Sequence, residues 1–234
     1  LSPVFAAAAD DPVTTFVLDN GMQVVVVEDH RAPVVQHMLW YRAGSADEPK
    51  GASGVAHFLE HLLFKATDTL EVGEFSAVVA ANGGNDNAFT SYDYTAYYQT
   101  LPSQYLEDAI KLESDRMSNL VVSKEDFLKE IEVIKEERRL RTDDQPEGIA
   151  YEQLYASAYN NSAYHDPIIG WMEDLHNMTE KDIFNWYKNW YAPNNATVVI
   201  VGDIDFENTF QLVEKYYGSK KNVKISDRVE RVEP

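Results

Sequence analysis

The sequence contains no cysteine. Disulfide bonds and thiolate-ligated zinc sites are therefore excluded, and any metal ion must be bound by histidine, aspartate or glutamate. Long apolar runs are missing as well, since no stretch approaches the roughly 18 residues that a membrane-spanning helix needs. We therefore expect no membrane span, and only nitrogen and oxygen atoms as candidate metal ligands.

Basic residues are scarce: 20 lysines and arginines stand against 39 aspartates and glutamates, and the formal net charge is −19. Such a surface repels nucleic acids and anionic membranes and favours cationic peptides or metal ions. Nucleic acid is therefore not an expected partner. At 234 residues, 44% hydrophobic and 25% charged, the chain is typical of one large globular domain or two small ones.

The first residues, LSPVFAAAADDP, are similar to the end of a secretory signal: a short apolar stretch, small residues in an A-x-A pattern, then acid. No basic segment precedes them, and a flexible alanine-rich terminus is the alternative. We expect residues 1–9 to be a signal-peptide remnant or a disordered tail and residues 10–234 to form a single domain. We also expect the protein to be exported to the periplasm.

Strand patterns occupy both ends of the chain. Residues 14–30 form two strand-like runs around Asp19-Asn20-Gly21, a strong signal for a hairpin. A third strand is expected over 33–44, an extended segment over 88–101 and a buried strand over 195–204. A helix should follow the third strand, with Ser53 as its N-cap.

Helical periodicity covers most of the remaining sequence. Helices are expected over 104–119, 123–143, 146–159, 179–190 and 206–217, the last ended by Gly218. No repeat and no internal linker is visible. The order of elements predicts an α+β class domain with a mixed, mostly antiparallel sheet flanked by helices on one face.

The segment HFLEH (57–61) places three ionisable groups in an otherwise apolar helix. On a helical projection His57, Glu60 and His61 share an arc about 100° wide, and apolar residues cover the other sides. Burying such groups without partners would cost several kcal/mol. A divalent metal explains the convergence, because neutral imidazoles four residues apart can aim at one point. The alternative is two core histidines bonded to backbone or a carboxylate.

The spacing H-x-x-E-H is the zincin motif reversed, the signature of inverzincins. A carboxylate at the position of Glu60 can act as general base toward a water that zinc activates. A catalytic zinc also needs a third protein ligand.

Candidates for the third ligand lie in KEDFLKEIEVIKEERRLR (124–141), although a charged helix is usually a solvated face. Helical phase places Glu130 and Glu137 beside the apolar side of this helix and turns Glu132 and Glu136 toward water. Phase alone cannot choose between Glu130 and Glu137.

Four other histidines lack partners at ligand spacing. We expect His30, His165 and His176 to be loop or surface residues. His37 lies inside the third predicted strand and should serve packing or be solvated.

The combination of HFLEH with the glutamate of EVIKEER resembles the pitrilysin/insulinase family of zinc peptidases, which includes the mitochondrial processing peptidases. Three further stretches resemble the same family: GGNDNAFTSYDYTAYY (83–98), YHDPIIGWMEDLHNMTEKDI (164–183) and YAPNNATVVIVGDID (191–205). The similarity covers the chain after residue 10.

This resemblance implies that His57, His61 and Glu137 bind Zn²⁺, that Glu60 is the base and that Glu130 supports the site without ligating. It also implies a processing-peptidase-like domain, a mostly antiparallel sheet flanked by helices. Active members pair two such domains as a clamshell, and this chain has room for one. A companion homologous domain or subunit is therefore an expected partner.

The expected function is a zinc-dependent metalloendopeptidase that hydrolyses unfolded peptides or short polypeptides, with zinc-activated water as nucleophile. The peptide should add as a strand along NAFTS, which comprises Asn87, Ala88, Phe89, Thr90 and Ser91. An ordinary edge strand is the alternative for that stretch. Two other functions remain open: a non-catalytic structural or substrate-presenting family subunit, and a metal-binding interaction module.

Overall fold

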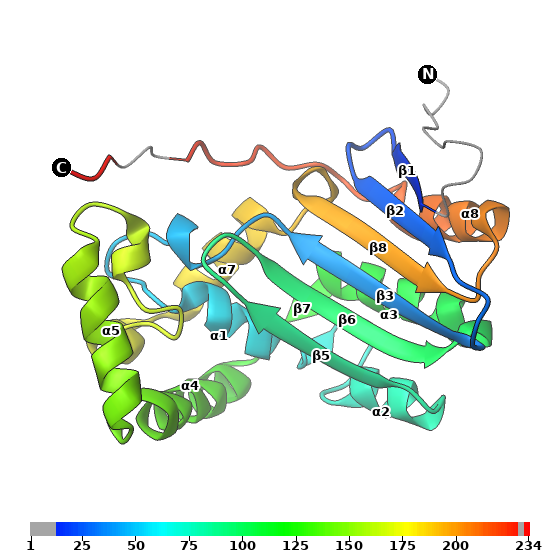
Figure 1. Cartoon of the computed structure of the whole chain (residues 1–234). Coiled ribbons are helices and arrows are strands. Elements are labelled where there is room, and N and C mark those ends of the chain that lie inside the picture. Colours follow the sequence, from blue (N-terminus) through cyan, green and yellow to red (C-terminus); the bar gives the residue numbers. More distant parts are fainter. Residues whose placement is uncertain (1–12, 229–231) are drawn as a thin grey trace.

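A six-stranded sheet runs through the molecule (Figure 1). The computed structural model describes residues 13–228 and 232–234, so the expectation for residues 1–9 lies outside the described residues. The strand order is β1-β2-β8-β3-β6-β5, and every neighbouring pair is antiparallel except β2 with β8. The sheet strands are β1 (Val13–Val17), β2 (Gln23–Glu28), β3 (Val34–Tyr41), β5 (Asn85–Thr90), β6 (Thr95–Pro102) and β8 (Ala196–Gly202). The prediction of a mixed, mostly antiparallel sheet is confirmed.

The sheet alternates along each strand between a buried and a more open face. In β3 the residues Val35, Leu39 and Tyr41 are buried, and in β8 Val198 and Ile200 are buried in the same way. Because successive side chains of a strand point to opposite faces, one face of the sheet supplies the hydrophobic core. A separate small ladder joins β4 (Ala66–Thr67) to β7 (Leu120–Val121).

The predicted hairpin joins β1 to β2. Gly21 adopts a left-handed φ of 83°, a conformation that glycine takes without the steric cost of a side chain. Asn20 closes the turn, because its Oδ1 accepts from the N–H of Met22 at 3.2 Å. Its amide also donates to the carbonyl of Tyr217 at 2.8 Å, which links the hairpin to the last helix.

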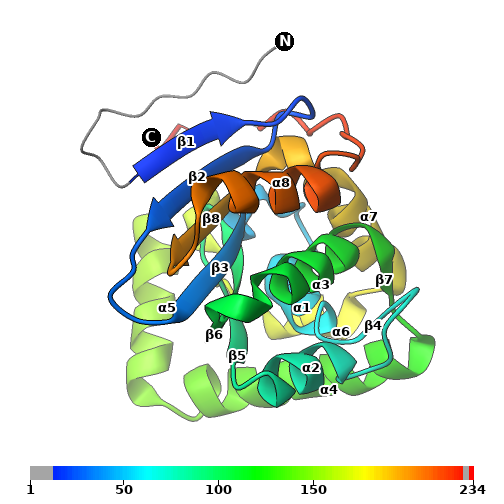
Figure 2. The same ribbon diagram turned by 90° about the vertical axis from the view of Figure 1, so that its right-hand side faces the viewer.

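Helices gather on one face of the sheet, where α1, α3 and α8 contact the strands (Figure 2). They are α1 (Val55–Leu62), α2 (Glu74–Ala81), α3 (Leu106–Asn119), α4 (Lys124–Arg138), α5 (Pro146–Ala158), α6 (Met172–Asn177), α7 (Glu180–Trp190) and α8 (Phe206–Tyr217). The sequence did not predict α2 and α6, which are only eight and six residues long. None of the described helices is both long and apolar enough to cross a membrane.

The helix predicted over 123–143 is α-helical only through Arg138 and continues as a π-helical turn, Arg139–Asp143. Such turns are rare and often occur at functional sites. Gly148 in α5 packs on this turn, because a Cβ there would lie 2.6 Å from the carbonyl oxygen of Arg141. The close approach of α5 therefore shapes the end of α4.

The prediction that Ser53 caps α1 is wrong. The N-cap is Gly54, with φ 88°, and the hydroxyl of Ser53 instead donates to Asp174 at 2.5 Å. The carboxylate of Glu48 takes over the capping role, because it accepts from the N–H groups of Gly54 and Ala56, both at 2.8 Å. Two otherwise unpaired donors at the helix start are thereby satisfied from the preceding loop.

We predict that Glu48→Ala lowers the free energy of unfolding by about 1–2 kcal/mol, the usual cost of losing a helix cap. Glu48 is only 7% exposed, so the freed N–H groups would find little water. Glu125→Ala is the control, because its ion pair with Lys129 is exposed on both sides and should contribute almost nothing. Urea unfolding of both variants measures the difference, and equal losses would contradict the capping role.

Candidate metal centre

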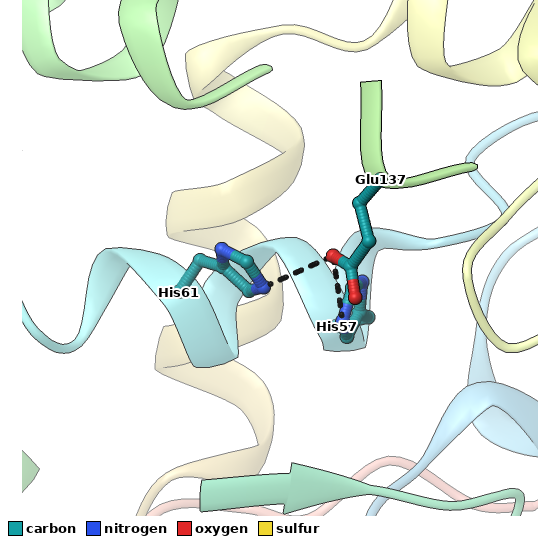
Figure 3. A group of neighbouring side chains, drawn as sticks. All are labelled: His57, His61 and Glu137. Carbon is teal, nitrogen blue, oxygen red and sulfur yellow. Dashed lines mark ion pairs between the residues drawn. The ribbon is translucent and has the colours of Figure 1, made fainter. Parts of the chain in front are cut away.

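Helix α1 presents His57 and His61 one turn apart, and α4 brings Glu137 to face them (Figure 3). Glu137 Oε2 lies 3.7 Å from His57 Nε2 and 3.5 Å from His61 Nε2. One ligand atom from each residue lies within 4.8 Å of the others. The three side chains are 12%, 23% and 16% exposed, so they converge in a largely buried place.

The donor atoms fit a divalent metal ion. Glu137 Oε2 is buried and has no hydrogen-bond partner among the described residues, while Oε1 pairs with Arg141 at 2.8 Å. A buried carboxylate oxygen without a partner is costly, and a cation between the two imidazoles would satisfy it. Two nitrogens and one carboxylate oxygen form a ligand set typical of catalytic zinc, with a position left open.

Glu130 does not join the three converging side chains. Its Oε1 accepts a hydrogen bond from His61 Nδ1 at 2.9 Å, and its Oε2 pairs with Lys65 at 2.6 Å. The bond fixes the tautomer of His61, because an ionised carboxylate can only accept, and it leaves Nε2 to face Glu137. The geometry therefore makes Glu137 the candidate third ligand and Glu130 a hydrogen-bond partner of His61, a choice that helical phase could not make.

The phase argument agrees with the exposure of α4. Glu130 and Glu137 are 11% and 16% exposed, whereas Glu132 and Glu136 are 64% and 58% exposed. The last two form ion pairs within the helix, Glu132 with the largely buried Lys135 and Glu136 with Arg139.

Burial and charge act differently on the two histidines. Burial lowers the pKa of His57 to about 4, so its ring is neutral at neutral pH. Burial also opposes the charge of His61, but the hydrogen bond to Glu130 and the neighbouring Glu137 outweigh it and raise its pKa to about 9. His61 in turn lowers the pKa of Glu137. A metal ion would take the place of the His61 proton, since ligands must be deprotonated.

Glu60 lies between the two histidines in α1 and is 8% exposed. Burial raises the pKa of its carboxyl, while a hydrogen bond from the hydroxyl of Thr90 acts in the opposite direction. A base with a raised pKa stands closer to neutral pH and takes up a proton more readily.

A cleft of about 920 Å³ opens over this site. His57, Glu60, His61 and Glu137 line it together with Arg141, and β5 supplies Asn87, Ala88, Phe89 and Thr90. Within the described residues β5 pairs only with β6, so its other edge borders the cleft.

Ser91 does not line the cleft. Its N–H donates to the carbonyl of Tyr94 at 2.8 Å, and its carbonyl accepts from the N–H of Ser45 at 3.1 Å. The domain itself therefore uses both backbone groups of the last residue in the predicted substrate segment.

The remaining histidines lie away from the centre. His30 is exposed and bonds Asp203, while His176 is exposed but lies in α6. His165 is partly buried and bonds the carbonyl of Tyr159 at 2.9 Å. His37 is fully buried between Gln99 and Tyr217, which agrees with a packing role.

Sequence reasoning missed two residues that support the centre, Lys65 and Arg141. Each stands four residues after a residue of the centre, Lys65 after His61 and Arg141 after Glu137. That spacing is the available signal, although the α-helix ends before each of them.

Comparison with protein families gives a direct assignment. The model of Insulinase (Peptidase family M16) matches residues 23–171, and the model of the Peptidase M16 inactive domain matches residues 177–234. The first match alone covers more than half of the chain. This chain belongs to the insulinase family of peptidases.

Relatives in the insulinase family are named as zinc proteases. The chain is 40% identical over 207 residues to zinc protease PqqE of Helicobacter pylori, covering 88% of this chain and 47% of the relative. It is 32% identical over 217 residues to an uncharacterized zinc protease of Mycobacterium leprae, covering 92% and 48%. The chain thus spans about half the length of the curated relatives it matches.

Solved structures of two bacterial proteases share the fold. A protease from Helicobacter pylori superposes with a TM-score of 0.90 at 36% identity, over 100% of this chain and 54% of the other. The periplasmic protease PqqL from Escherichia coli gives 0.87 at 28% identity, over 98% and 26%. The chain therefore spans about half of the first structure and about a quarter of the second.

Proposed function

We propose that this chain is the zinc-bearing half of a metalloendopeptidase that cleaves unfolded peptides or short polypeptides. The observation that carries the proposal is the convergence of His57, His61 and Glu137 around a buried carboxylate oxygen that no described residue hydrogen-bonds, beside the buried acid Glu60. Membership of a peptidase family supports the same reaction.

In the proposed reaction Glu60 removes a proton from the attacking water and passes it to the leaving amine. Zinc, when bound by the three ligands, would polarise the scissile carbonyl and lower the pKa of water toward about 7. Glu130 orients His61, and Arg141 holds the second oxygen of Glu137. Ligand geometry is therefore fixed before substrate arrives.

The peptide is proposed to pair along Asn87–Thr90 with the edge of β5 that has no neighbouring strand among the described residues. Unpaired backbone groups at a sheet edge accept an added strand, and such pairing reads backbone rather than side chains. Apolar residues that line the same cleft, among them Ala88 and Ile169, would contact side chains of an unfolded substrate.

Two other functions compete with this proposal, a non-catalytic family subunit and a metal-binding interaction module. Zinc analysis combined with a peptide-cleavage assay separates the three. Stoichiometric zinc with chelator-sensitive cleavage supports the peptidase. Zinc without cleavage in the complete protein supports an interaction module. The absence of both zinc and cleavage supports a non-catalytic subunit.

We predict that the chain alone binds zinc but cleaves peptides poorly, because a companion half is needed. Catalysis requires a positioned substrate, donors for the oxyanion and exclusion of bulk water, and β5 and the cleft stand open here. The assay compares the chain with and without a companion half at equal zinc content. Chelator-sensitive cleavage by the lone chain at an unchanged rate would contradict the prediction.

Residues 10–234 are proposed to fold as one domain and the mature protein to act in the periplasm. The A-x-A pattern near the N-terminus motivates the second proposal, and the relative PqqL carries the word periplasmic in its name. Cell fractionation of the native protein tests it, and a cytoplasmic location would contradict it.

A further inference from the structure

Thr90 ends the edge strand β5 and points toward the helices. Side chains alternate along a strand, and Asp86 on the same side of β5 accepts a hydrogen bond from Ser76 of α2 at 2.6 Å. Phe89 points the other way, where its ring lies 5.4 Å from that of Trp40. Thr90 therefore faces the helix layer, and its hydroxyl reaches Glu60 of α1.

The hydroxyl of Thr90 donates to Oε2 of Glu60. Within the described residues it is the hydrogen bond that anchors this carboxylate, and no described residue bonds Oε1. Glu60 has three side-chain torsions before its carboxylate, the last of them broad, so a single anchor decides where the second oxygen points.

We propose that Thr90 is a positioning residue for the general base, an inference that rests on the proposed function. Its hydroxyl holds Oε2 of Glu60 and leaves Oε1 for the attacking water. The backbone of the same residue borders the edge on which the peptide would pair. One residue thus sets the spacing between the substrate strand and the base.

Two substitutions at Thr90 separate the hydroxyl from the shape of the side chain. Thr90→Val keeps the branched shape and removes the donor, whereas Thr90→Ser keeps the donor. Thr100→Val is the matched control, because Thr100 is partly buried in the neighbouring strand β6 and does not line the cleft.

With the companion half present, we expect Thr90→Val to lower kcat roughly 10-fold or more, since a hydrogen bond to a charged group is lost. KM and zinc content should stay unchanged, and Thr90→Ser should retain most of kcat. Thr100→Val should behave as wild type. A Val variant with full kcat, or a Ser variant as slow as Val, would overturn the role of the hydroxyl.

A double-mutant cycle shows whether Thr90 acts through Glu60. In a Glu60→Gln background, Thr90→Val should slow the residual reaction little further. Independent, multiplicative effects would show that Thr90 acts on the substrate instead and would overturn the proposal.

Crystal structures of zinc-loaded wild type, Thr90→Val and Thr90→Ser give a readout that needs no activity. The Glu60 carboxylate should leave its place in the Val variant and keep it in the Ser variant. An unmoved carboxylate in the Val variant overturns the proposal. A zinc-loaded wild type that cleaves nothing with its companion contradicts the proposed function instead, so the two failures are distinct.

Discussion

Replacing Glu60 with glutamine is expected to lower turnover by roughly 10²-fold or more while zinc binding and fold persist. Glutamine has nearly the same shape, but its amide cannot take the proton from water. The Thr90 hydroxyl can still donate to the amide oxygen, so the side chain should stay in place. The measurement is kcat in the presence of the companion half, at equal zinc content.

The control for Glu60→Gln is Glu132→Gln, the same chemical change on α4. Glu132 is 64% exposed, pairs with Lys135 of the same helix and does not line the cleft, so turnover should not change. Full activity in a zinc-loaded Glu60→Gln protein would remove Glu60 from the mechanism, and equal losses in both variants would point to a general effect of lost charge.

Removing a ligand is expected to abolish stoichiometric zinc. His57→Ala, His61→Ala and Glu137→Ala each delete one of three donor atoms that converge in the cleft. The loss in affinity should exceed the roughly 10- to 100-fold that follows loss of an outer hydrogen-bond partner of a ligand. The loss of zinc affinity in Glu130→Gln should fall within that smaller range, because Glu130 hydrogen-bonds His61 but is not one of the three ligands.

Glu136→Ala provides the matched control for the ligand variants, since Glu136 is adjacent to Glu137 and 58% exposed. Zinc per chain, measured after dialysis against metal-free buffer, should stay close to the wild-type value. Equal losses from Glu136 and Glu137 would show that the orientation of α4 is wrong.

The ligand pair on α1 could be predicted from the sequence because its geometry is local. Four residues of helix bring His57 and His61 to one side whatever the rest of the fold does. The apolar residues around them then show that this helix is buried.

The choice between Glu130 and Glu137 could not be made in this way. Both lie on one stripe of α4, and only the distance between α4 and α1 decides which of them meets Nε2 of His61 and which meets Nδ1. The prediction of the N-cap of α1 failed for a related reason. Ser53 has a side chain suited to capping but lies one residue before the N-cap Gly54, and Glu48 reaches the donors from the preceding loop.

The position of β8 within the sheet could not be predicted from the sequence either. Residues 195–204 were predicted as a buried strand, yet no local pattern states that this strand lies between β2 and β3. Pairing between distant segments depends on the whole chain rather than on any window of it.

Because β8 is inserted between β2 and β3, the sheet is completed only after all three metal ligands have been synthesised. All three ligands have left the ribosome long before Ala196–Gly202, yet until then β2 and β3 have no neighbour between them and expose open edges that invite pairing with other chains. Residues 23–171, the span matched by the insulinase model, hold every ligand and lack the strand that joins the sheet. A shortened protein cut to that span would therefore carry the complete zinc signature on an interrupted sheet.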